Sequence, residues 1–201
     1  MTGINLIIVK RTSPKLLEEM ERHYSQPKGF VGRNICYEVF YDDISYGHIV
    51  GGSATRFLPG RDDFLGLNAR DSLNKIVNNI FFHVEPYDGK YPLRNFTTRV
   101  IELFERTVVL DWYNKYGDKV IALETLVELP RSGECYRRAG WTKTGQTKGY
   151  TCKRVAGKGT DDWGGQRVWD TKNLRPKLVF LKKIRMEWPA SKSLPLIPRK
   201  H

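Results

Sequence analysis

The spacing of apolar and polar positions predicts a β-α-β-β-β succession in the first half of the chain. Branched apolar runs are typical of buried strands, and a serine followed by proline is a favourable helix start. Two apolar runs that flank an Asp-Asp pair predict a hairpin. The expected elements are a strand at 5–9, a helix starting at Ser13-Pro14, a hairpin of 34–41 and 44–54, a long loop at 55–71 and a β-like run at 76–84.

The second half contains the clearest helical pattern. Apolar side chains keep a 3.6-residue period over 97–115, and Gly117 is placed to cap the end of that helix. Residues 120–127 are apolar on both alternations, which predicts a central strand covered on both faces. A short helix over 132–139 ends at Gly140. The order β-α-β-β-β-α-β-α-β predicts an α/β fold built on a mixed sheet.

Charge divides the chain unevenly. The 201 residues carry a formal net charge of +12, and residues 137–185 alone hold 14 Lys and Arg against three acidic residues, a local excess of +11. We therefore expect an approximately neutral domain over 1–155, a basic aromatic extension over 156–185 packed on or beside it, and a flexible tail over 186–201.

The basic segment has the composition of a nucleic-acid interface. Cations neutralise phosphates, aromatic rings stack on bases and glycines let the backbone approach closely. The alternative is a solvated face that only aids solubility. We favour binding to double-stranded DNA, with these candidate residues: Lys143, Lys148, Lys153, Arg154, Lys158, Trp163, Arg167, Trp169, Lys172 and Arg175.

Other features restrict the class of protein. The three cysteines are widely spaced and form no Cys/His cluster, which argues against a disulfide framework and predicts no metal site. No apolar run has the ~18 residues of a membrane span, and the N-terminus lacks a secretory pattern. We expect a cytoplasmic protein with no membrane contact.

Polar residues inside the predicted elements are candidates for chemistry. Glu124 is the one charge in the central strand, which fits either a general base with a raised pKa or a salt bridge to an arginine. His23 is a second candidate base, although a histidine on an apolar helix face is more often structural. Asn78 and Asn79 could read an adenine edge, or they could mark a β-bulge.

The sequence around Tyr136 resembles one known family. The stretch Tyr136-Arg-Arg-Ala-Gly140-Trp is similar to the short helix and turn near the end of GCN5-related N-acyltransferases. That resemblance covers about residues 35–155 and implies their fold, with Tyr136 protonating the departing thiolate. The Gly-rich cofactor loop of that family is missing here. The corresponding anion-binding candidates at the start of the central helix are Arg94, Asn95, Thr97, Thr98 and Arg99.

Dispersed motifs indicate a narrower group. His23-Tyr24, Asn78-Asn79, 94–99, Glu124-Thr125 and the Tyr136 helix occur in an order that resembles Mom-type phage DNA-modification proteins and, more distantly, DruA-like proteins. Mom-type enzymes convert adenine in DNA to N6-carbamoylmethyladenine and so protect phage DNA from restriction. The resemblance implies an adenine-modifying transferase, adds Tyr24 to the catalytic candidates and implies the cytoplasm of an infected host.

The acyl donor stays open at this point. It is either an acetyl-CoA-like thioester or an aminoacyl carrier such as glycyl-tRNA, because a glycyl group on N6 could rearrange to the carbamoylmethyl isomer. Two other functions also fit: a non-catalytic DNA-binding protein on a degenerate acyltransferase scaffold, and an acyltransferase for a small amine or a protein. The oligomeric state is not predicted.

Overall fold

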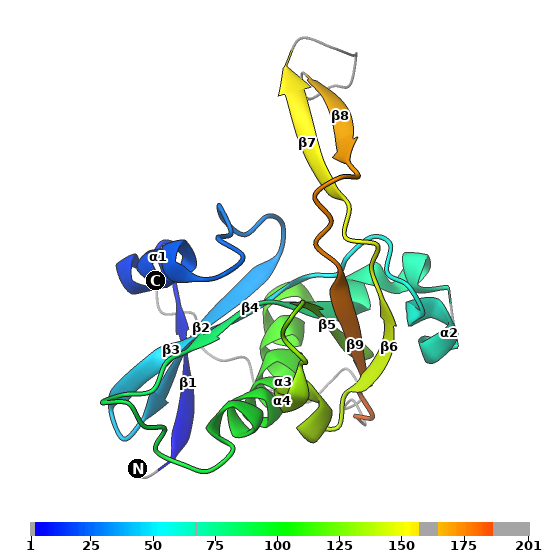
Figure 1. Cartoon of the computed structure of the whole chain (residues 1–201). Helices are drawn as coiled ribbons and strands as arrows, with labels where there is room; N and C mark the ends of the chain where they lie inside the picture. The colour runs from blue at the N-terminus through cyan, green and yellow to red at the C-terminus, as the bar shows by residue number, and fades with distance from the viewer. Residues whose placement is uncertain (1–2, 67, 157–164, 187–201) are drawn as a thin grey trace.

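A computed structural model describes residues 3–66, 68–156 and 165–186, with backbone alone at 69–71, 151–156 and 165–169. Figure 1 shows the arrangement of the elements. The strands and helices expected up to residue 138 are present, but the expected loop at 55–71 contains a short helix and the start of a 3-10 helix. In chain order they are β1 (Ile4–Val9), α1 (Pro14–Arg22), β2 (Asn34–Tyr41), β3 (Ile44–Ser53), α2 (Arg61–Leu65), a 3-10 helix (Ala69–Lys75), β4 (Ile76–Val84), α3 (Phe96–Tyr116), β5 (Ala122–Glu128), α4 (Glu134–Arg138), β6 (Thr142–Gln146), β7 (Thr151–Ala156), β8 (Gly165–Asp170) and β9 (Lys177–Lys183).

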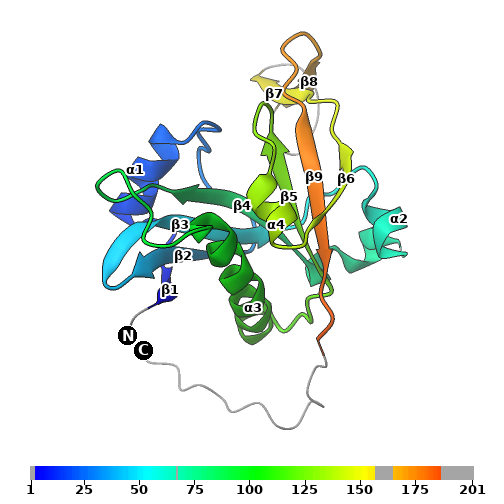
Figure 2. The same cartoon turned by 60° about the horizontal axis from the view of Figure 1, so that its bottom comes forward.

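Seven strands form one mixed sheet in the order β1-β2-β3-β4-β5-β9-β6. All neighbouring pairs are antiparallel except β4 and β5, which are parallel. Helices α3 and α4 pack on one face, and α1 and α2 cover the other (Figure 2). The mixed α/β architecture that the sequence predicted is therefore confirmed.

Helix α3 supplies the main core. Its buried side chains include Val100, Phe104, Val108 and Trp112, which recur at helical spacing and face the sheet. Gly117 ends the helix in the left-handed conformation at φ 77°, and its N–H donates to the Tyr113 carbonyl. The predicted helix and its glycine cap are both confirmed.

Strand β9 lies inside the main sheet, between β5 and β6. We expected its residues in a basic aromatic extension packed on or beside the domain, because of the charge excess over 137–185. Within β9, Leu178, Val179, Phe180 and Leu181 are buried, so the strand belongs to the core. The main sheet is therefore made of the strands within residues 4–146 and of β9, which joins β5 to β6.

Strands β7 and β8 pair with each other and project from the body as an arm (Figure 1). Two short connections join the arm to the sheet, 147–150 after β6 and 171–176 before β9. Gly149 lies where these connections meet, and its carbonyl accepts a hydrogen bond from Arg175 N–H at 2.9 Å. We call these two connections the arm base.

The parallel pairing of β4 and β5 is short. It runs from Ile76–Ala122 to Asn79–Thr125, after which the two strands diverge toward different neighbours, as Figure 2 shows. The β3–β4 register shifts at the same level, with Gly51 opposite Asn79 and Val50 opposite Phe81. Ile80 is the extra residue between these pairs and forms a β-bulge. A bulge was one of the two interpretations of the Asn78-Asn79 pair.

None of the helices in the described ranges combines the length and apolarity that crossing a membrane requires.

Candidate active site

A cleft of about 830 Å³ opens where β4 and β5 diverge. Its walls come from β4, β5, the end of α1 and the segment that leads into α4. The cleft brings together five of the candidates chosen from the sequence: His23, Tyr24, Asn79, Tyr136 and, at the start of α3, Thr97. We call this space the central cleft.

Tyr136 is held rigidly at the bottom of the divergence. Its hydroxyl donates to Asn79 Oδ1 at 2.5 Å. Asn79 is fixed in turn, because its amide donates to the carbonyls of Val50 and Phe81, each at 3.0 Å. Burial raises the pKa of Tyr136 well above its ordinary value, so the phenol is protonated at neutral pH.

The local sequence explains how α4 presents this tyrosine. Gly133, at φ 67°, turns the chain into the helix, and a Cβ there would lie 2.5 Å from the Phe180 ring. The Tyr136 ring packs 5.1 Å from Trp141 and 6.0 Å from Phe180, measured between centroids. The aromatic that follows the predicted turn is therefore a packing partner of Tyr136.

His23 lies at the end of α1, next to the bulged strand. Its Nδ1 is 2.8 Å from Ser25 Oγ and accepts the Ser25 backbone N–H at 3.3 Å. Burial, assisted by the charges of His83 and Arg131, lowers the pKa of His23 to about 4. The imidazole is thus neutral at physiological pH and keeps a lone pair.

Tyr24 forms part of the rim of the cleft. The Arg131 guanidinium carbon lies 3.5 Å from the centroid of its ring, a close cation–π contact. The tyrosine is 37% exposed, so this stacked pair is accessible from outside. Arg22 also lines the cleft, which gives the rim a second cation.

Glu124 lies on the opposite face of β5. Arg61 Nη1 donates to its carboxylate at 3.0 Å and the Thr55 N–H donates at 2.5 Å. Asn78 is on the same side and donates to Thr55 Oγ1 at 2.9 Å. Burial raises the pKa of Glu124 although Arg61 opposes that rise. Of the two readings of Glu124, the geometry favours the salt bridge, and it places Glu124 and Asn78 behind the central cleft.

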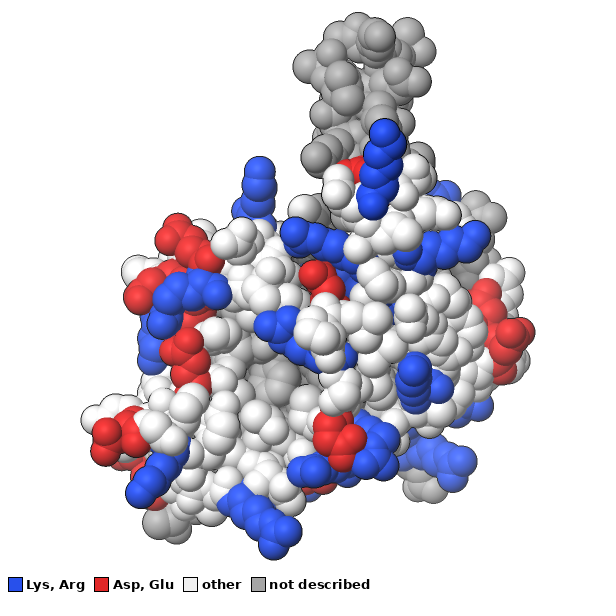
Figure 3. All heavy atoms as spheres, viewed as in Figure 1, with Lys and Arg blue, Asp and Glu red and all other residues white. Residues whose placement is uncertain are grey.

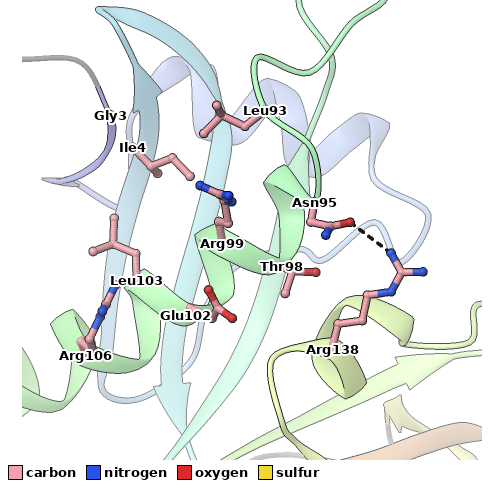
Figure 4. A pocket seen from close by; sticks show the side chains of 10 residues that line it. All are labelled: Gly3, Ile4, Leu93, Asn95, Thr98, Arg99, Glu102, Leu103, Arg106 and Arg138. Carbon is pink, nitrogen blue, oxygen red and sulfur yellow. Dashed lines mark hydrogen bonds between the residues drawn. The ribbon is translucent and has the colours of Figure 1, made fainter.

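The anion-binding candidates at the start of α3 face in different directions. Thr97 lines the central cleft, whereas Asn95, Thr98 and Arg99 line a separate groove of about 700 Å³ (Figure 4). Consecutive helical residues point about 100° apart, which separates 97 from 98 and 99. Arg138 closes the groove by donating to Asn95 Oδ1 at 3.3 Å. Arg94 is exposed and outside the described linings of both cavities.

A third cavity of about 610 Å³ lies at the arm base. It adjoins the central cleft, since Ser25, Leu126 and Lys177 line both. Lys148 and Arg175 stand at its edge, with Tyr150 and Phe57 46% and 74% exposed. Figure 3 shows lysine and arginine side chains gathered where the arm meets the body. We call this space the arm-base cavity.

The structure places the predicted DNA-binding residues unevenly. Lys148 and Arg175 line the arm-base cavity, and Lys172 is exposed in the same connection to the arm. Lys143 is exposed on β6, outside the described cavity linings. Lys158 and Trp163, and the side chains of Lys153, Arg154, Arg167 and Trp169, lie outside the described residues.

Three residues of the site were missed by sequence reasoning. Ser25 follows the His23-Tyr24 pair directly, so its position was a usable signal. Arg131 stands in a Pro-Arg-Ser-Gly loop before the Tyr136 helix. Lys177 reaches the cleft only because β9 enters the sheet beside β5, which no local pattern indicates. Within the described ranges, His, Cys, Asp and Glu form no group that could hold a metal ion.

Comparison with known proteins agrees on the fold. No protein-family model and no curated protein matches the sequence. Among solved structures, the chain is similar to a Bacillus subtilis acetyltransferase in complex with CoA (9% identity, 91% of this chain and 100% of the other, TM-score 0.52). It is also similar to an aminoglycoside acetyltransferase in complex with coenzyme A and kanamycin (11%, 90% and 95%, 0.51) and to a GNAT-family acetyltransferase from Elizabethkingia anophelis with acetyl-CoA bound (10%, 90% and 98%, 0.50). The chain therefore has the GCN5-related acetyltransferase (GNAT) fold that the Tyr136 stretch indicated.

The buried ion pair behind the cleft gives a stability prediction. Arg61→Ala leaves the Glu124 carboxylate buried without its cation, so we expect the free energy of unfolding to fall by about 3–5 kcal/mol. Urea denaturation measures this loss. Arg56→Ala removes an exposed cation from the loop that precedes α2 and is expected to change stability by less than about 0.5 kcal/mol. An Arg61→Ala protein as stable as wild type would contradict the role of the pair.

His23 predicts a pH dependence of stability. Its pKa in the folded protein, about 4, lies below the unfolded value of 6.5. The folded state therefore resists protonation: the contribution is complete above pH 6.5 and is lost as the pH falls toward 4, by about 3 kcal/mol in total. His23→Gln cannot titrate and should flatten this part of the curve. Urea titrations of both proteins from pH 7 to pH 4 measure the slopes, and parallel slopes would refute the assignment.

Proposed function

We propose that the chain is an acyltransferase-type enzyme that transfers an acyl-derived group to N6 of adenine in DNA. If that group is glycyl, its free amine can attack C6 and displace the original N6, which leaves as the amide nitrogen, so that the rearranged product is N6-carbamoylmethyladenine. The observation that carries the proposal is the central cleft, because it holds a proton donor and a neutral imidazole on either side of the diverging strands. Its continuation into a basic cavity at the arm base favours a nucleic acid as the acceptor.

The acyl-bearing end of a donor fits along β4. Among the described residues, no strand pairs with the β5-facing edge of β4 beyond Asn79. An extended amide-containing chain can hydrogen-bond to such an edge as an added strand. The solved structures with CoA or acetyl-CoA share this fold, which supports a thioester or a comparable activated acyl group there.

The carrier end of the donor fits less well to coenzyme A. The start of α3 is Asn95 in the left-handed conformation at φ 58°, with no glycine pair to cradle a pyrophosphate. The three arginines of the Figure 4 groove, Arg99, Arg106 and Arg138, stand nearby instead. This arrangement favours a carrier that offers phosphates over a wider span, as an aminoacyl-tRNA does.

Tyr136 is the proposed acid for the leaving group. It reaches the cleft with its proton in place, and its raised pKa keeps that proton until a strongly basic oxygen or sulfur departs. A departing ribose alkoxide is a stronger base than a thiolate, so this tyrosine matches an aminoacyl ester at least as well as a thioester. Asn79 orients the hydroxyl.

DNA is the proposed acceptor on two grounds. Lys148, Arg175 and Lys177 border the arm-base cavity, where they could neutralise phosphates. Tyr150 and Phe57 present exposed rings at the same cavity, on which an extruded base could stack. The ordered motifs that resemble Mom-type proteins supply the choice of adenine N6.

Mass spectrometry of nucleosides tests the catalytic proposal. DNA from cells that express the wild-type protein is expected to contain a new adenine-derived nucleoside. Tyr136→Phe should lower its amount about a hundredfold, because one general acid contributes about 10²–10⁴ in rate. Tyr87→Phe, at an exposed tyrosine outside the cleft, is the matched control. DNA binding without any new nucleoside would favour the non-catalytic function, and an acylated protein or small amine would favour the third.

The salt dependence of DNA binding tests the arm-base cations. Replacing Lys148 and Arg175 with glutamine should weaken binding and make the plot of log affinity against log salt shallower by about 1.8, since each phosphate contact contributes about 0.9. Fluorescence anisotropy with a short duplex measures both quantities. Lys119→Gln, at an exposed lysine outside the cavities, should leave the slope unchanged. An unchanged slope in the double variant would place the DNA elsewhere.

A further inference from the structure

Ser25 stands where the two proposed substrates would meet. Ser25, Leu126 and Lys177 are the residues common to the central cleft and the arm-base cavity. Of these, Ser25 has the hydroxyl, which can both accept and donate a proton. It is partly buried and follows His23 by two residues, so its backbone is held by the turn that ends α1.

The hydrogen bonds of His23 define the direction of the serine proton. The Ser25 backbone N–H donates to His23 Nδ1 at 3.3 Å. An N–H group can only donate, so Nδ1 carries a lone pair and no proton. The Ser25 hydroxyl, 2.8 Å from the same nitrogen, therefore donates to it as well. Its own lone pairs stay available to a group that enters from the arm-base cavity.

We propose that Ser25 takes the proton of the acceptor nitrogen and passes its own hydroxyl proton to His23 Nδ1. This inference rests on the proposed function. As the acceptor nitrogen bonds to the acyl carbon, its N–H electron pair stays on nitrogen and the proton moves to Ser25 Oγ. The bond from the acyl carbon to the leaving oxygen or sulfur breaks, and that atom takes the proton of Tyr136. His23 then loses its extra proton to solvent, and Tyr136 regains a proton from solvent.

A weakly basic imidazole is adequate for this step. A nitrogen that has bonded to an acyl carbon is strongly acidic, so the relay needs an unprotonated acceptor more than a strong one. His23 meets that need, because its buried ring is neutral over the whole physiological range. Tyr136 and Ser25 both line the central cleft, so that one can donate a proton and the other accept one.

The competing explanation is that Ser25 only stabilises the turn after α1. The backbone N–H bond to His23 would serve that purpose without the hydroxyl. Two substitutions separate the explanations: Ser25→Ala removes the hydroxyl and keeps the backbone bond, and Ser25→Thr keeps both. Ser13→Ala, at a serine whose side chain makes no capping bond, is a control for loss of a hydroxyl near α1.

The experiment measures the initial rate at which modified adenine accumulates in cells, per amount of soluble protein, together with the affinity of each purified variant for a short DNA duplex. We expect Ser25→Ala to lower the rate about a hundredfold with unchanged DNA affinity and thermal midpoint. Ser25→Thr should recover most of the rate, and Ser13→Ala should match wild type.

Several outcomes would overturn the relay. A Ser25→Ala protein as active as wild type removes the hydroxyl from the mechanism, and a Ser25→Thr protein as inactive as Ser25→Ala shows a packing role. An acyl adduct on Ser25 in the intact mass of the wild-type protein would make the serine a nucleophile instead. If the wild-type protein forms no modified adenine at all, the proposed function itself fails. This result is distinguishable from failure of the relay, because in the outcomes above the wild-type protein is active.

Discussion

The divergence of β4 and β5 is the constraint on which the rest of the structure depends. Two parallel strands that separate inside a sheet leave unpaired backbone, which must be compensated by other bonds. Asn79 and Thr125, the last paired residues, provide part of that compensation: Thr125 Oγ1 donates to the Asn79 carbonyl at 3.0 Å, and the Asn79 side chain is bonded at both ends. The opening is therefore built into the sheet, and Tyr136 is one of the groups that hold it.

Burial sets the protonation state on both sides of this opening. The same loss of hydration raises the pKa of the Tyr136 phenol and lowers that of the His23 imidazole, so both groups are neutral. The central cleft thus presents an uncharged proton donor and an uncharged proton acceptor. The cations stay outside, on the rim at Arg131 and at the arm base, where water still reaches them.

Much of the fold and part of the site could be predicted from the sequence. The features that could be predicted are those with a local signal, such as a helical period or a short motif. The helical period located α3, and the Tyr136 motif located the proposed acid, because both signals are local. Glu124 and Thr125 are adjacent, and a strand alternates its faces, so one enters the cleft and the other the opposite core. The sequence shows that a charge is buried there, but the face depends on which strands become neighbours. Lys177 was missed for the same reason, because its proximity comes from the tertiary arrangement. Ser25, two residues after His23, was within reach of the local sequence.

The position of β9 has a consequence for how the protein is made. Residues 122–128 and 142–146 leave the ribosome with a vacant place between them, and the strand that fills it arrives only after the whole arm has been synthesised. Pairing across such a separation is slow compared with local hairpins. The nascent chain therefore cannot close its central sheet, or complete the wall that Lys177 adds to the cleft, before the basic arm is present. The main sheet and the arm are in this way completed in a single folding event.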